Sequence, residues 1–81
     1  MTAELVKILE AAKYAYDGFM YYYEKSETTG SIIDRATWTR YAAEAHSKWS
    51  AYKHCYEILT GKTLFSDADV LDEIAMLQSQ A

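Results

Sequence analysis

A stripe of apolar side chains runs with helical period through the first part of the chain. In three successive heptads every a, d and e position is apolar: Leu5, Ile8, Leu9, Ala12, Ala15, Tyr16, Phe19, Tyr22 and Tyr23. The chain contains no proline, so no residue interrupts a helix by removing a backbone donor. The stripe therefore predicts a helix over about residues 3–26 that buries one face against other helices.

A second helix is predicted over about residues 32–60. The polar segment 27–31 contains Gly30 and predicts a tight interhelical loop. Ser31 is the expected N-cap, with Asp34 as the alternative cap. The helix has a seam of apolar residues spaced by fours and threes: Trp38, Ala42, Ala45, Trp49, Tyr52, Tyr56 and Leu59. Gly61 is the expected residue after its end.

A third, short helix is predicted over about residues 67–79. Ser66 and Asp69 have the spacing of a capping box, and Phe65 and Val70 have the spacing of a hydrophobic staple. We expect this helix to turn back over the end of the second one.

The predicted fold class is all-α, and residues 1–81 form a single domain. The first two helices make a long antiparallel hairpin, and the third covers its open end, over Tyr56 and Leu59. Folding at the loop is expected to bring Phe19 and Tyr23 near Trp38 and Tyr41. Four aromatic residues are assigned to the core: Phe19, Trp38, Trp49 and Tyr52. Such a hairpin leaves apolar surface uncovered, so we expect two copies to form a dimeric helical bundle.

Composition and charge exclude several classes of partner. The chain has 12 acidic and 8 basic residues and a net charge of −4, and no basic patch emerges, so we expect no nucleic-acid partner. No apolar run approaches the ~20 residues of a membrane-spanning helix. Glu4 lies near the start without a long apolar run after it, so no secretory signal is expected. A single cysteine, Cys55, fits a reducing compartment. These features predict a soluble, cytoplasmic protein.

No motif in the chain points to catalysis or to a bound cofactor or metal. His46 and His54 are eight residues apart and project about 80° apart on a helix, so they cannot share one ion. Cys55 follows His54 directly and diverges from it by about 100°. The tripeptide 61–63 resembles the end of a phosphate-binding loop, but Tyr56 stands where that loop needs glycine. We therefore expect no catalytic, cofactor-binding or metal-binding residues.

Two tyrosines lie outside the apolar stripe of the first helix. Tyr14 and Tyr21 are one heptad apart, and Val6 and Met20 occupy the adjacent row. These four residues form a second, partly apolar strip and are the candidate interface. The alternatives are scattered surface aromatics or a strip covered by the third helix.

The sequence is best interpreted as a non-catalytic protein–protein interaction or assembly module that forms a homodimer. A small inhibitor that binds a host protein, of the kind encoded by phages and mobile elements, is the first alternative. A monomer with an exposed tyrosine strip would favour that class. An enzyme with a site built at an oligomer interface is the second alternative, and a reactive Cys55 would favour it.

Overall fold

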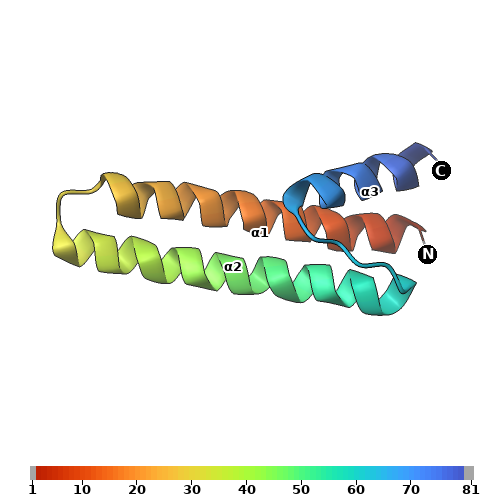
Figure 1. Ribbon diagram of the computed structural model, residues 1–81, viewed down its shortest axis with the longest axis horizontal. Helices are drawn as coiled ribbons and strands as arrows, with labels where there is room; N and C mark the ends of the chain where they lie inside the picture. Colours follow the sequence, from red (N-terminus) through yellow and green to blue (C-terminus); the bar gives the residue numbers. More distant parts are fainter. Residues whose placement is uncertain (1, 80–81) are drawn as a thin grey trace.

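Three helices make up the protein in the computed structural model, which describes residues 2–79 (Figure 1). They are α1 (Thr2–Thr28), α2 (Ile32–Thr60) and α3 (Asp67–Ser79). The first two form an antiparallel hairpin in a molecule 48 Å long. The third folds back along the N-terminal half of α1. The predicted all-α hairpin with a short third helix is confirmed.

The predicted caps set the starts of α2 and α3. The Ser31 hydroxyl accepts a hydrogen bond from the Asp34 backbone N–H at 3.3 Å, so Ser31 rather than Asp34 caps α2. At α3, the Ser66 hydroxyl accepts from the Asp69 N–H at 3.4 Å. The Asp69 carboxylate accepts in return from the Phe65 N–H at 2.9 Å. These reciprocal bonds satisfy donors that the first turn of α3 leaves unpaired.

The predicted hydrophobic staple at α3 does not form. Val70 is fully buried, but the Phe65 side chain is 81 % exposed. The Phe65 N–H bonds to Asp69, and its ring lies in solvent while the neighbouring Leu64 enters the core instead. Leu64 therefore anchors the segment between α2 and α3.

The helix ends at the two connections differ in backbone conformation. Continuing to Thr28, α1 runs two residues beyond its predicted end. Within residues 2–79, Gly61 is the residue with positive φ, at 73°, and its N–H bonds to the Glu57 carbonyl at 2.8 Å. Gly30 does not adopt this conformation, so only Gly61 ends its helix as a left-handed cap.

Replacing the two glycines by alanine should therefore have different effects. Gly61→Ala must place a Cβ in the left-handed region, which should lower the free energy of unfolding by about 1 kcal/mol. Gly30→Ala meets no atom within 4 Å and should be neutral or slightly stabilising. Urea titration followed by circular dichroism measures both variants. Equal losses would contradict the assigned cap.

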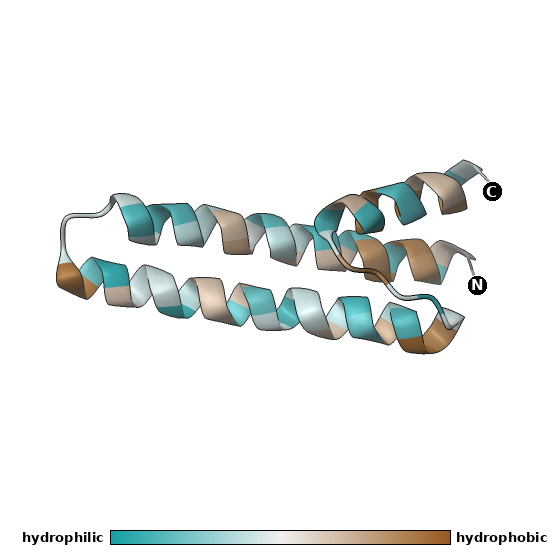
Figure 2. Ribbon diagram, viewed as in Figure 1, coloured by the Kyte–Doolittle hydropathy of each residue, from teal (hydrophilic) through white to brown (hydrophobic). Residues whose placement is uncertain are grey.

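The large buried side chains gather at one end of the hairpin. Leu9, Tyr56 and Val70 are fully buried and form one cluster with Leu64 and Leu77. Figure 2 shows apolar residues concentrated where α3 covers the first half of α1. Farther along the hairpin the buried residues are small: Ala12, Ala15, Ala42, Ala45 and Ser26. Only the end that α3 covers thus has a three-helix core.

The aromatic residues that were assigned to the core are less buried than predicted. Phe19, Trp38 and Trp49 are half-buried, and Tyr52 is 41 % exposed. Two helices cannot enclose a large ring from all sides, and α3 is too short to reach the rest of the hairpin. It covers Tyr56 but leaves Leu59 57 % exposed, so the predicted cover over Leu59 is wrong.

The register of the hairpin also differs from the prediction. Phe19 contacts His46, with ring centroids 5.1 Å apart, and Tyr22 stacks on Trp38 at 5.9 Å. The residue beside Trp38 is three positions farther along α1 than expected, which is about one turn. Tyr22 therefore takes the place expected for Phe19.

Candidate functional site

An open groove follows the seam between α1 and α2. Its volume is about 710 Å³, and none of its lining residues belongs to α3. The lining combines five tyrosines, three charged residues and four small residues: Tyr14, Tyr21, Tyr22, Tyr41, Tyr52, Asp17, Glu44, Lys48, Ala11, Ala15, Gly18 and Ala45. We call this feature the tyrosine groove.

Small residues create the depth of the tyrosine groove. A Cβ placed on Gly18 would lie 3.9 Å from the Ala45 Cβ, so the two helices are close at this level. Large side chains stand on both sides of this line of small residues. Four of the tyrosines retain substantial exposure: 84 % for Tyr14, 54 % for Tyr21, 37 % for Tyr41 and 41 % for Tyr52. Their rings present apolar area and their hydroxyls remain available to water or to a partner.

The four candidate interface residues do not stay together in the structure. Tyr14 and Tyr21 both line the tyrosine groove. Val6 is partly buried against the core cluster that α3 completes, which matches the alternative of cover from the third helix. Met20 is 46 % exposed and does not line the groove.

Sequence analysis missed the contribution of α2 to this groove. Tyr52 was assigned to the apolar seam of its helix, and Tyr41 was expected beside Phe19 and Tyr23, yet both line the groove. Their spacing with Ala45 and Lys48 places all four on one side of α2. That mixture of small, aromatic and charged side chains was the available signal.

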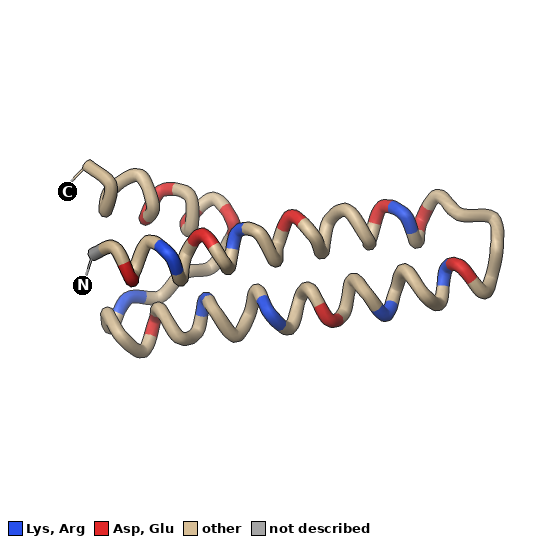
Figure 3. Tube along the Cα trace, turned by 180° about the vertical axis from the view of Figure 1, so that it is seen from behind, with Lys and Arg blue, Asp and Glu red and all other residues tan. Residues whose placement is uncertain are grey.

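Charged side chains of the groove differ in their pairing. Asp17 forms an ion pair with Lys13 at 2.8 Å, and this hydrogen bond raises the pKa of Lys13. Within residues 2–79, Glu44 and Lys48 have no ion pair or side-chain hydrogen bond. Figure 3 shows acidic and basic positions interspersed along both long helices. The groove therefore offers one unpaired charge of each sign.

The other side of the hairpin seam carries a second aromatic cluster. Its rings contact one another at centroid distances of 5.1–6.0 Å: Tyr16, Phe19, Tyr23, His46 and Trp49. Each ring of this cluster therefore covers part of its neighbours. The Lys53 ammonium lies 5.5 Å from the centroid of the Trp49 ring and adds a favourable cation–π contact there.

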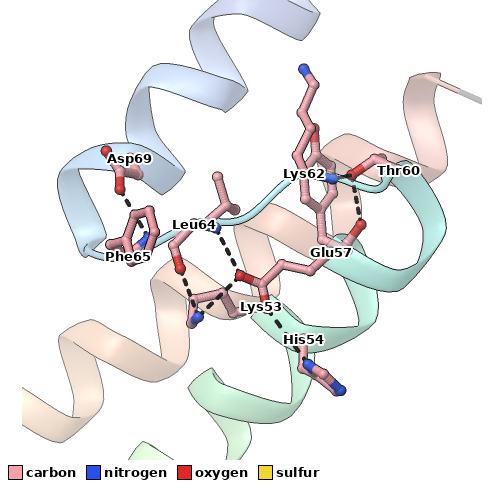
Figure 4. Close-up of polar contacts among 9 residues, drawn as sticks. Lys53, His54, Glu57, Thr60, Lys62, Leu64, Phe65 and Asp69 are labelled. Carbon is pink, nitrogen blue, oxygen red and sulfur yellow. Dashed lines mark hydrogen bonds and ion pairs between the residues drawn. The ribbon is translucent and has the colours of Figure 1, made fainter.

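A polar network holds the segment between α2 and α3 in place (Figure 4). The Glu57 carboxylate accepts from the Leu64 N–H at 2.7 Å and from the Lys53 ammonium at 3.4 Å. Lys53 also donates to the Leu64 carbonyl at 2.7 Å. The hydrogen bond from Leu64 lowers the pKa of Glu57, and Lys53 lowers it further. Both backbone groups of Leu64 are thus satisfied as its side chain is buried.

Tyr56 joins α2 to α3 beneath this network. Its hydroxyl donates to the Glu73 carboxylate at 2.5 Å, and Lys62 donates to the same oxygen at 3.1 Å. Burial, and then the bond to Glu73, raises the pKa of Tyr56 to about 12. This arrangement positions α3, and it explains why α3 stays on the side of α1 away from the tyrosine groove.

The residues with metal-binding or nucleophilic chemistry do not converge. The His46 ring meets the Phe19 ring edge-on, and the exposed His54 lies with its Nδ1 3.6 Å from Glu57. Cys55 is exposed and free. In the part of the chain that the structure describes, no three His, Cys, Asp or Glu side chains form a group that could hold a metal ion.

No family model, curated protein or solved structure matches the chain. Over residues 2–79, neither long helix contains a stretch apolar enough to cross a lipid bilayer. The tyrosine groove is the surface feature that best supports a proposal of function.

Proposed function

We propose that this protein is a non-catalytic interaction module that self-associates through the tyrosine groove. The observation that carries the proposal is a row of exposed tyrosines around small residues, on a face without α3. Tyrosine is enriched in protein interfaces because its rigid ring buries a large area while its hydroxyl tolerates water. A contiguous aromatic surface of this kind marks a contact site more often than isolated exposed rings do.

A second copy of the chain suits this groove in charge and in shape. A two-fold interface must be complementary to itself, and the groove presents both Glu44 and Lys48, neither of which has an ion-pair partner among residues 2–79. It also combines projecting rings with small residues such as Ala11 and Ala15, so a ring of one copy meets space in the other.

The exposed area fits a dimer of moderate affinity. At the exposures of Tyr14, Tyr21, Tyr41 and Tyr52, these side chains present on the order of 400 Å² per copy, if a tyrosine has about 200 Å². A standard interface buries about 800 Å² per partner. The tyrosines supply roughly half of that area, and the charged side chains between them supply more. We expect a dissociation constant on the order of micromolar.

The solution mass across a concentration series tests the proposal. Size-exclusion chromatography with light scattering should give the 9.3 kDa mass of one chain at low concentration. The mass should double as concentration rises through the micromolar range. A constant monomer mass up to millimolar concentration would overturn self-association. The groove would then be available to a different protein, as the inhibitor alternative requires.

A further inference from the structure

We infer that the two copies pack antiparallel, with α1 on α1 and α2 on α2, about one two-fold axis that crosses the tyrosine groove at the level of Gly18 on α1 and of His46 on α2. This inference rests on the proposed self-association and adds its geometry. It comes from the order of side chains along the two long helices. On each helix, residues at equal distances on either side of one midpoint are complementary to each other.

On α1 the pattern is centred between Asp17 and Gly18. Tyr14 and Tyr21 lie equally far on either side of this point, and both line the groove. An axis through the midpoint sets Tyr14 of each copy opposite Tyr21 of the other. Four residues farther out on each side are Glu10 and Lys25, two exposed side chains of opposite charge. The same axis brings them together across the interface.

On α2 the pattern is centred on His46. Glu44 and Lys48 lie two residues to either side of it, and neither has an ion-pair partner within residues 2–79. Across an axis at this level each Glu44 faces the other copy's Lys48, and the pair occurs twice. The unpaired charges of the groove are thereby matched without any residue from another protein.

The exposed apolar residues at the two ends of α2 are also arranged symmetrically about His46. Ile33 and Leu59 lie thirteen residues to either side of His46 and are 78 % and 57 % exposed. Figure 2 shows both ends of α2 as apolar. An antiparallel partner brings the first turn of one α2 beside the last turn of the other. Apolar side chains that remain largely exposed in one chain would then meet each other.

One axis can serve both helices because the two midpoints lie at the same level of the hairpin. The Phe19 and His46 rings are 5.1 Å apart, and a Cβ on Gly18 would be 3.9 Å from the Ala45 Cβ. A two-fold axis perpendicular to the hairpin needs this coincidence. If α1 instead packed on α2 of the other copy, this coincidence of levels would not be needed, and Glu44 would not face Lys48.

Charge reversal separates these geometries. Glu44→Lys places a lysine against Lys48 of the other copy in both pairs, and Lys48→Glu places two glutamates against each other in the same way. Each variant alone should self-associate about tenfold more weakly or worse than the original chain, since two pairs become repulsive. An equimolar mixture should form heterodimers within about threefold of the original affinity, because every facing pair is again of opposite sign.

The matched control places the same charges outside the groove. Ser50 is an exposed α2 residue that does not line the groove. Ser50→Lys and Ser50→Glu should each dimerise like the original chain and should show no preference for each other. Sedimentation equilibrium gives the affinities, and native mass spectrometry separates homodimers from heterodimers. A similar heterodimer preference in the Ser50 pair would assign the effect to net charge and overturn the inference.

A cysteine on the axis supplies an independent readout. In a Cys55→Ser background, Gly18→Cys adds a Cβ that makes only ordinary contacts, at 3.9 Å from Ala45 and Tyr22, and it would lie close to its counterpart beside the axis. It should form a disulfide-linked dimer under mild oxidation, whereas Ser50→Cys should stay monomeric on a non-reducing gel. If the original chain dimerises but Gly18→Cys fails to cross-link and the charge variants fail to pair, the antiparallel geometry is wrong and self-association stands. A monomeric original chain overturns both.

Discussion

Replacing Tyr14 and Tyr21 together by glutamate should convert the proposed dimer into a folded monomer. The side chains are 84 % and 54 % exposed, so one chain loses little packing, and α1 tolerates glutamate well. The dimer loses four rings and gains four charges beside Asp17 and Glu44. Interface anchors of this kind contribute about 2 kcal/mol or more each, so the loss of both should raise the dissociation constant about 1000-fold or more. Light scattering reports the mass, and circular dichroism reports the helix content.

Two control variants separate the loss of the groove contacts from a general effect of substituting tyrosine. Tyr23→Glu changes the same residue type on the same helix at a similar exposure of 49 %, but Tyr23 does not line the groove. That variant should remain dimeric. Tyr14→Phe with Tyr21→Phe keeps the rings and should weaken the dimer only slightly. An unfolded Tyr14→Glu/Tyr21→Glu protein would instead mean that these residues belong to the core.

Tyr56→Ala should cause the largest loss of stability that a single substitution produces in this chain. The side chain is fully buried, and its hydroxyl is bonded to Glu73. Truncation removes the largest member of the core cluster and leaves a cavity between α2 and α3. We expect the free energy of unfolding to fall by about 4 kcal/mol, a large part of the total for a domain of this size. Urea titration followed by circular dichroism measures the loss.

Tyr56→Phe isolates the hydroxyl and has a distinct pH signature. Lys62 still bonds to Glu73, so this variant should lose only about 1 kcal/mol at neutral pH. In the original chain the pKa of Tyr56 is raised to about 12 in the folded state. Its contribution is complete below the unfolded value near pH 10 and is lost as the pH rises towards 12. Tyr56→Phe should lack this alkaline decline, and an unchanged alkaline decline would assign it to other groups.

Much of the fold could be predicted from local patterns. The heptad stripe of α1, the Ser31 cap and the left-handed Gly61 are all determined by residues within a few positions of one another. The register of the hairpin depends on contacts between the two helices, such as Tyr22 with Trp38, and it differs from the expected one by about one turn. The exposure of Phe65 was missed for a related reason. Burial of the adjacent Leu64 and the bond from the Phe65 N–H to Asp69 outweighed the local staple pattern.

The candidate site could be predicted only in part. Tyr14 and Tyr21 were found because they break the pattern of one helix. Tyr41 and Tyr52 satisfy the pattern of theirs, so only their position beside α1 shows that they line a groove. From its place on the helix, Val6 was expected to be as exposed as Tyr14, but its side chain packs against the core cluster that α3 completes. The position of α3 depends on contacts such as Tyr56 with Glu73, which are 17 residues apart in sequence, and spacing along one helix cannot reveal them.

The short reach of α3 has a consequence for how the protein gains stability. One end of the hairpin is reinforced by three helices, while the end near the turn depends on alanines and a single buried serine. In an antiparallel pair, each reinforced end lies beside the lightly packed turn of the other copy. Opening of the turn in one chain would then also remove contacts from its neighbour. In the proposed pair, folding and association would form one linked equilibrium, and the free energy of unfolding would rise with protein concentration.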